Sequence, residues 1–133
     1  MVATSNHARV GRAIELVAGA LEPWIDDIVA PRLPPGVAWT DLLAEKDGRT
    51  GKTYSPSDLQ SQLRLITERM DNLGFLFSGT LSRGEQNLAG ELRDVRNHWA
   101  HNNVFSIDDT YRALDTAERL LRAIRRPDRK SVV

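Results

Sequence analysis

One short segment of the sequence combines residue types that can act together on a phosphodiester. The run RNHWAH, from Arg96 to His101, places an arginine, an amide and two imidazoles within about two turns of a helical pattern. Arginine binds phosphate oxygens with its planar guanidinium, and histidine gains or loses a proton near neutral pH. The segment is therefore a candidate site for phosphodiester cleavage without a metal ion.

The composition of the chain narrows the classes of protein to which it can belong. Its 133 residues suffice for one domain with a buried core, expected at residues 1–126, followed by a basic tail or linker at 127–133. The formal net charge is zero, so any surface for nucleic acid must be local. Cysteine is absent, which excludes disulfides, thiolate metal sites and cysteine nucleophiles. The absence of cysteine also fits the cytoplasmic setting that we expect, and no apolar stretch approaches the roughly 18 residues of a membrane span, so no membrane contact is expected.

Apolar residues recur at helical spacing along the chain, and no segment alternates as a strand does. The first helix, from about residue 5, is predicted by Val10, Ile14, Val17, Ala18 and Leu21. Pro23 should end or kink this helix, and a second short stretch should run to Pro31. Residues 31–55 are rich in proline and glycine and predict a long connection, with one helical turn at 41–45. The pattern predicts an all-α fold.

Capping residues mark the starts of three later helices. The segment SPSD at residues 55–58 supplies a cap, a proline at the first helical position and an acid in the first turn. The helix that follows should stop near Gly79. Ser82-x-x-Glu85 and Ser106-x-x-Asp109 are capping boxes. The first box should open the helix that carries Arg96–His101, and the second should open the last helix.

The loop GRTGKT at residues 48–53 looks like the end of a phosphate-binding loop but departs from its pattern. The true loop needs four residues between its glycines, a preceding strand and a following helix. Here two residues intervene, and no strand precedes them. We interpret the segment as a solvated loop, in which Arg49 and Lys52 could still contact a phosphate.

Helical geometry, at about 100° per residue, sorts the residues around the candidate site. One narrow apolar stripe should face the core, and it consists of Leu88, Leu92, Val95 and Trp99. Asn97 and His101 are four residues apart and lie together on the opposite, outward face. Gly90 and Arg93 also face outward, and Gly90 would let the backbone of a partner approach. Arg96 lies on the flank between the two faces, about 140° from His101.

Each of these residues also has a purely structural explanation. Arg96 could pair with Asp94 or Glu91 while its stem covers the core. His101 could be a histidine that interacts with the helix dipole, and Asn97 could be a surface amide. Both readings remain open on spacing alone.

The remaining polar residues near the site have simpler expected roles. His98 lies off the face of His101, so we expect a surface or flank residue rather than a catalyst. The two asparagines at 102–103 should end the helix, and His7 receives no role. Two histidines three residues apart have no carboxylate or cysteine to complete a metal site, so we expect no metal and no cofactor.

Two longer strings resemble a known family. The segment ELRDVRNHWAH at residues 91–101 resembles the signature of the HEPN superfamily, an arginine and a polar residue followed by a histidine after a short gap. Together with DTYRALDTAERLL at residues 109–121, it is similar to the branch related to the nuclear transcript-surveillance endoribonuclease. The similarity extends from the first helix to about Ile124. It implies a HEPN-like helical bundle of four main helices plus short helical segments.

The resemblance also implies a function and the residues that perform it. Members are metal-independent endoribonucleases that work as dimers, or inactive relatives that serve as interaction modules. Bacterial members of this branch are often attached to larger ATPases or phage-defence proteins. In this chain His101 matches the motif histidine, Arg96 its arginine and Asn97 the polar residue. His98 stands where many relatives have a basic residue, which makes the local basic surface pH-dependent.

The leading hypothesis from the sequence is a ribonuclease in which the 2′-hydroxyl of RNA attacks the neighbouring phosphate. His101 would transfer protons, Arg96 would stabilise the phosphate charge, and Asn97 would orient either group. One helix supplies one copy of these three residues, so a homodimer is expected to complete the site. The expected biological setting is phage defence or a toxin–antitoxin system. The residues expected to contact RNA are Arg93, His98, Arg122 and Arg125. The alternative is an inactive module that dimerises or docks a regulator, an antitoxin or the ATPase domain of a parent protein.

Overall fold

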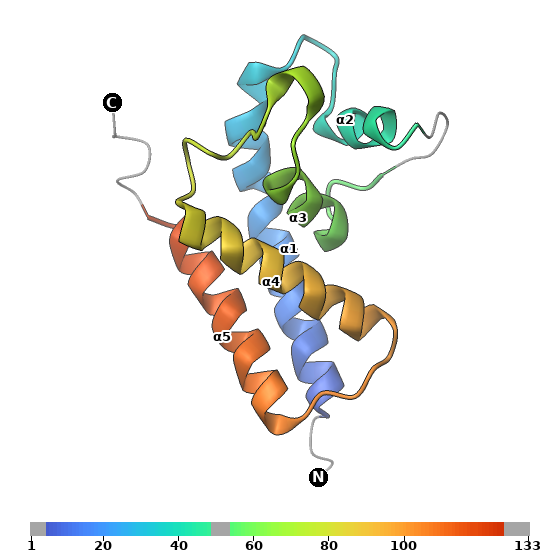
Figure 1. The fold of residues 1–133 in the computed structure, drawn as a ribbon, viewed down its shortest axis with the longest axis vertical. Coiled ribbons are helices and arrows are strands. Elements are labelled where there is room, and N and C mark those ends of the chain that lie inside the picture. Colours follow the sequence, from blue (N-terminus) through green and yellow to red (C-terminus); the bar gives the residue numbers. More distant parts are fainter. Residues whose placement is uncertain (1–4, 49–53, 127–133) are drawn as a thin grey trace.

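The computed structural model describes residues 5–48 and 54–126, and these residues form an all-helical fold without strands (Figure 1). The loop prediction for residues 49–53 and the tail prediction for 127–133 lie outside the described residues. The described α-helices are α1 (Asn6–Val29), α2 (Trp39–Lys46), α3 (Leu59–Thr67), α4 (Arg83–Ala100) and α5 (Ile107–Ile124). Short 3-10 helices span Ala30–Arg32 and Asp71–Leu73. The prediction of an all-α bundle is confirmed.

Helix α1 runs through Pro23, so the predicted end of the first helix at this residue is wrong. Proline inside a helix costs about 3 kcal/mol because it lacks an N–H and crowds the preceding turn. Leu21 and Ile25, on either side of Pro23, are completely buried, and so is Val29. Each such burial contributes about 1.5–3 kcal/mol. Burial of one continuous apolar stripe therefore outweighs the cost of the proline.

Helix α3 and the chain that follows it also differ from the prediction. Asp58 is the N-cap and accepts a hydrogen bond from the backbone N–H of Ser61, so the helix begins later than Ser55. It ends at Thr67 instead of near Gly79, and the following chain turns back, with Gly74 at φ +69°. This turn lets the adjacent Leu76 and Phe77 both reach the core, where they are 2% and 0% exposed. One face of a longer helix could not bury both neighbours.

The predicted turn at 41–45 is part of α2, which is one turn longer than expected. Trp39 and Leu43, four residues apart, are both buried and fix this short helix against the domain. The two capping boxes are confirmed, because Ser82 and Ser106 accept hydrogen bonds from the backbone N–H of Glu85 and Asp109. Local capping chemistry therefore sets the starts of α4 and α5.

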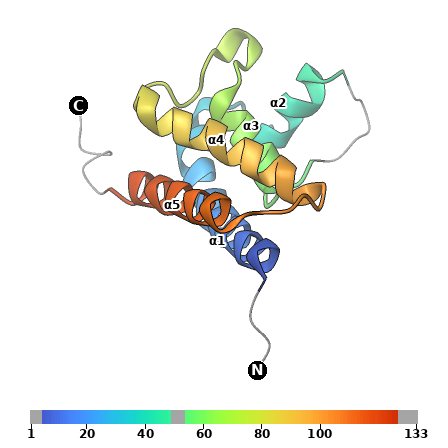
Figure 2. The ribbon, with the colours of Figure 1, turned by 60° about the horizontal axis from the view of Figure 1, so that its bottom comes forward.

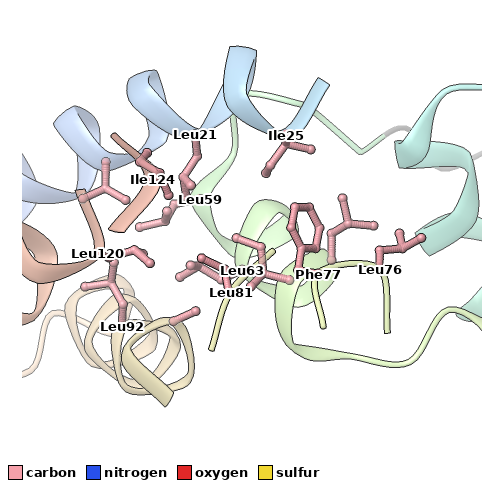
Figure 3. Close-up of a cluster of buried hydrophobic side chains, with 14 of the residues drawn as sticks. Leu21, Ile25, Leu59, Leu63, Leu76, Phe77, Leu81, Leu92, Leu120 and Ile124 are labelled. Carbon is pink, nitrogen blue, oxygen red and sulfur yellow. The ribbon is translucent and has the colours of Figure 1, made fainter. Parts of the chain in front are cut away.

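Helices α4 and α5 form an antiparallel hairpin against α1 (Figures 1 and 2). Figure 3 shows apolar side chains from α1, α3, α4, α5 and the 74–81 segment meeting in one core. The labelled residues of that core are Leu21, Ile25, Leu59, Leu63, Leu76, Phe77, Leu81, Leu92, Leu120 and Ile124. A second, smaller cluster lies at the other end of α1 and consists of Val10, Phe105 and Ala113. Between them, the two clusters hold α4 along its whole length.

A network of ion pairs joins α2, α3 and α4. Glu68 contacts Arg64 at 2.9 Å and both Lys46 and Arg93 at 3.1 Å. Arg64 also donates two hydrogen bonds of 2.8 Å to the carboxylate of Asp47. Hydrogen bonds from Arg64 lower the pKa of Glu68 below its ordinary value, and partial burial opposes this shift. The network fixes the middle of α4 relative to α3.

Replacing Glu68 should weaken the fold and reduce its dependence on acid pH. Because the pKa of Glu68 is lower in the folded chain, its contribution is complete above the ordinary glutamate value of about 4.3 and is lost as the pH falls through the folded value. We expect Glu68→Gln to lose about 1–3 kcal/mol of unfolding free energy at pH 7. Urea unfolding at pH 7, 4 and 3 measures both effects.

The matched control for this prediction is Glu118→Gln. Glu118 pairs with Arg122 on the surface, where both side chains are more than half exposed, and such pairs contribute little. The control should stay within about 0.5 kcal/mol of the native chain. If the unfolding free energies of the native chain and of Glu68→Gln fall by the same amount between pH 7 and pH 3, the role assigned to Glu68 is refuted.

Candidate active site

The C-terminal end of α4 presents His101 to solvent. Asn102 adopts a left-handed conformation at φ +56°, and its backbone N–H donates to the carbonyl of Trp99 at 3.0 Å. The N–H of Asn103 donates to the carbonyl of His98 at 3.2 Å, which completes a Schellman motif. The prediction that the two asparagines end the helix is confirmed. His101 is the C-cap, so its side chain leaves the last turn of the helix.

The imidazole of His101 is exposed and makes no hydrogen bond within residues 5–48 and 54–126. Its backbone N–H donates to the carbonyl of Asn97 at 3.1 Å, which ties it to the last turn. Asn97 is half-buried, and within the same described ranges its side-chain amide is also without a hydrogen bond. Both polar groups of this pair are therefore available to a ligand or a partner.

Arg96 lies on the flank of α4, as predicted, but neither Asp94 nor Glu91 is its partner. Its side chain is 29% exposed, and Nη2 lies 3.8 Å from Oδ1 of Asp58. The other carboxylate oxygen of Asp58 caps α3 and accepts hydrogen bonds from the backbone N–H and the hydroxyl of Ser61. Glu91 pairs with Arg112 of α5 instead, at 2.7 Å. Within the described residues this long contact is the ion pair of Arg96, and the outer N–H groups of its guanidinium remain available to a phosphate.

Trp99 attaches this end of α4 to α1. The indole N–H donates to the backbone carbonyl of His7 at 3.0 Å, and the two rings stack with centroids 5.0 Å apart. A side chain at Gly11 would approach the indole to 2.9 Å, so this contact needs a glycine. Trp99 is half-buried, although the stripe predicted a core residue. His7, which received no role from the sequence, lies in α1 and covers the indole.

His98 organises the loop that connects α4 to α5. Its ring lies nearly perpendicular to that of Phe105, with the two centroids 4.8 Å apart. Asn103 Nδ2–H donates to His98 Nδ1 at 3.1 Å, so Nε2 carries the hydrogen and donates to the carbonyl of Val104 at 3.1 Å. These three contacts agree with the expectation that His98 is a flank residue. The expectation that it contacts RNA stays a prediction.

The other residues expected to contact RNA do not gather around His101. Arg93 was predicted to face outward, but it turns to α3 instead, because it donates to Thr67 Oγ1 at 2.9 Å and pairs with Glu68. Arg122 pairs with Glu118, and Arg125 is the exposed C-cap of α5. The C-terminal end of α5 lies beside the start of α4, where Arg126 meets Glu85 at 2.9 Å. Arg122 and Arg125 are therefore separated from His101 by about the length of α4, roughly 27 Å for 18 residues.

A cavity of about 370 Å³ lies beside Arg96, and no sequence pattern had indicated it. Its walls come from the middle of α1, the start of α3 and the end of α4, with Asp58, Arg96 and Trp99 among them. These elements are far apart in the sequence, so only their packing creates the cavity. Arg96 is the member of the predicted catalytic set that lines it.

The described residues provide neither a metal site nor a membrane-spanning helix. Within them, no group of three or more histidine, cysteine, aspartate or glutamate side chains could hold a metal ion. None of the described helices has the length and apolar character needed to cross a membrane.

Comparison with known proteins agrees with the resemblance found in the sequence. The model of one family, described as Swt1-like HEPN, matches residues 12–125. No curated protein and no solved structure matches the chain. The matched region begins within α1, at residue 12, and includes both the Arg96–His101 segment and α5. The chain belongs to the Swt1-like HEPN family.

Proposed function

We propose that this HEPN protein is a metal-independent endoribonuclease whose proton-transferring group is His101. One observation carries the proposal: the motif histidine is exposed and makes no hydrogen bond to any described residue, while the motif arginine is half-buried on the same helix. A histidine that served only the fold would be expected to contact it, as His7 and His98 do. His101 is instead available to a substrate.

The side chains suit cleavage of RNA by its own 2′-hydroxyl. His101 accepts the proton of that hydroxyl, the 2′-oxygen attacks phosphorus, and the bond from phosphorus to the 5′-oxygen breaks. The leaving oxygen then takes a proton from an imidazolium. Arg96 stabilises the negative charge that grows on the phosphate, and the free amide of Asn97 orients the phosphate or His101. The products are a 2′,3′-cyclic phosphate and a 5′-hydroxyl.

A homodimer would supply two copies of this set around one cleft. Arg96 and His101 project about 140° apart on one helix, so one chain does not surround a phosphate with both. Three exposed apolar side chains follow His101 and offer a surface for a second copy: Val104, Ile107 and Tyr111, exposed by 87%, 66% and 67%. We refer to these three residues as the apolar patch. Ile107 and Tyr111 are four residues apart on one face of α5, and exposed apolar groups on one face are typical of an interface.

Placing a charge in the apolar patch should separate the dimer and reduce cleavage. Ile107→Glu keeps the fold, because an acid in the first turn of a helix is favourable. We expect this variant to sediment as a monomer and to cleave RNA at least about tenfold more slowly, since half of the composite site is lost. Analytical ultracentrifugation and the cleavage rate are the two readouts.

Phe75→Glu is the matched control, because Phe75 is also apolar and 46% exposed but lies in the segment between α3 and α4. It should remain dimeric and active. A monomeric native chain that cleaves RNA, or a dimeric Ile107→Glu variant, would refute this choice of interface.

The activity itself is tested with a panel of fluorescent RNAs in the presence of EDTA. Cleavage that continues in the chelator and leaves 2′,3′-cyclic phosphate ends would support the proposal. Loss of cleavage on adding EDTA would refute the metal-free mechanism. A folded native dimer that cuts no RNA would refute the enzyme and favour the second candidate.

The second candidate function is an inactive interaction module, favoured by the pairing of the surface arginines. Arg93, Arg119, Arg122 and Arg126 each contact a carboxylate, so the positive charge of these four side chains is already partly compensated. In that case the apolar patch would dock an antitoxin or the ATPase domain of a parent protein in a phage-defence system. RNA binding at low salt discriminates the two, because a phosphate channel binds tightly there and weakens steeply with added salt.

A further inference from the structure

The cavity beside Arg96 has features that the proposed cleavage step does not use. At about 370 Å³ it lies within the size range of small-ligand sites, roughly 300–1,000 Å³. Ile14, Ala18 and Leu59 contribute apolar walls from α1 and α3. Trp99 and Arg96, one turn apart on α4, complete it with an indole and a planar guanidinium. The cavity therefore combines apolar walls with one flat group, the guanidinium of Arg96, that can stack on a ring.

Gly19 keeps the α1 side of the cavity open. It lies inside a 24-residue helix, where glycine costs about 1 kcal/mol relative to alanine. A Cβ atom built at this position would meet no other atom within 4 Å, so no neighbouring atom requires the missing side chain. Gly11, by contrast, is required by its contact with Trp99. Gly19 lines the cavity, and because it has no side chain, this part of the wall stays open.

The charges at the cavity select against a phosphate and in favour of a neutral group with N–H donors. Asp58 also lines the cavity, and its Oδ1 lies 3.8 Å from Nη2 of Arg96, so the guanidinium charge is already partly compensated. Glu15 adds a second carboxylate, 3.5 Å from Arg12 and 73% exposed. Two carboxylates would repel a phosphate, whereas they accept hydrogen bonds from the amino group of a base. Among flat neutral groups, the nucleobases adenine, cytosine and guanine carry such an exocyclic amino group, and uracil does not.

We propose that this cavity binds one unpaired nucleobase of the RNA, with a preference for bases that carry an amino group over uracil. Arg96 stacks on the base, Trp99 forms part of the apolar wall, Asp58 accepts from the amino group of the base, and the outer side of Arg96 remains directed to the adjacent phosphate. Because the base must leave a helix to enter, single-stranded RNA is the substrate class. This inference rests on the proposed function, since Arg96 belongs to both the cavity and the cleavage site.

The test measures binding without cleavage, using fluorescently labelled 2′-O-methyl oligonucleotides that lack the attacking hydroxyl. One oligonucleotide is all uridine, and three others carry a single adenine, cytosine or guanine. Native protein should bind these three about fivefold or more tightly than the all-uridine one. Gly19→Phe, which obstructs the cavity, should weaken binding of all three about tenfold, the effect typical of losing one stacked base.

Two further variants separate the cavity from general effects. Gly84→Phe is the matched control, because Gly84 is also an exposed helical glycine but lies at the other end of α4, where an added Cβ would meet Ser82 Oγ at an ordinary contact distance of 4.0 Å. It should bind like the native chain. Asp58→Asn retains a good helix cap while it removes the carboxylate. It should bind all four oligonucleotides with nearly equal affinity.

The outcomes are decisive in both directions. Equal affinities for Gly19→Phe and Gly84→Phe would overturn the base site, and equal native affinities for uridine and the other three would overturn the preference. Gly19 lies four residues before Pro23 in α1, so Gly19→Phe could destabilise the helix, and melting curves are measured with the binding data. If Gly19→Phe does not fold, Gly19→Met is used in its place. Native-rate cleavage by Gly19→Phe would leave the endoribonuclease intact and refute the cavity. The native protein could instead show base-dependent binding, lost in Gly19→Phe, but cleave no RNA. This result would support the base site in the cavity and refute the endoribonuclease.

Discussion

His101→Ala should abolish RNA cleavage and leave the fold unchanged. Loss of a general acid–base group typically lowers a rate by about 10²–10⁴-fold. The side chain is exposed and makes no hydrogen bond to a described residue, so its removal takes no contact from the folded chain. We therefore expect the melting temperature to stay within about 2 °C of the native value. Cleavage of a fluorescent RNA in EDTA and a thermal melt measure the two effects.

His7→Phe is the matched control for this prediction. It removes an imidazole from the same end of the domain but keeps an aromatic ring against Trp99. Its cleavage rate should remain close to native. A His101→Ala variant that cuts RNA at the native rate would contradict the assignment, and an inactive His7→Phe variant that folds normally would show that loss of activity is not specific to His101.

Arg96→Ala should lower the cleavage rate by about 10²–10³-fold, the typical effect of removing one group that stabilises the transition-state charge. Arg96→Lys should recover part of this loss, because lysine keeps the charge but not the planar fork. Stability should change little, because the ion pair with Asp58 is long at 3.8 Å and both side chains are partly exposed. Single-turnover cleavage, with RNA affinity measured separately, distinguishes a chemical role from a binding role.

A mixture of two inactive variants tests whether the site spans two chains. If each cleft contains groups from both copies, a heterodimer of Arg96→Ala and His101→Ala retains one arginine and one histidine. An equimolar mixture, unfolded and refolded together, should then cut RNA at least about tenfold faster than either variant alone. Heterodimers that form but remain as slow as the single variants would contradict a shared site.

Features encoded by neighbouring residues were predicted well from the sequence. The starts of α4 and α5 depend on hydrogen bonds between residues three apart, Ser82 with Glu85 and Ser106 with Asp109. The end of α4 depends on an asparagine that tolerates a left-handed backbone. Such interactions need no distant partner, so a local pattern is enough to predict them.

Features that depend on distant contacts were predicted poorly. The length of α1 is decided by what Ile25 and Val29 pack against, and the early end of α3 by the burial of Leu76 and Phe77. Both run against local propensity, since proline disfavours one helix and apolar spacing favours extending the other. Tertiary burial is the larger energy in each case.

The same division applies to the candidate site. The sequence by itself determined that Arg96 and His101 lie on one helix, that this helix ends just after His101, and that the family is HEPN. Only the tertiary structure decided that Arg96 faces Asp58, that His7 covers Trp99, and that a cavity opens beside them. Spacing within a helix fixes the direction of each side chain, because the geometry repeats every 3.6 residues. The partner that each side chain meets depends on how separate helices pack, and no local pattern records that packing.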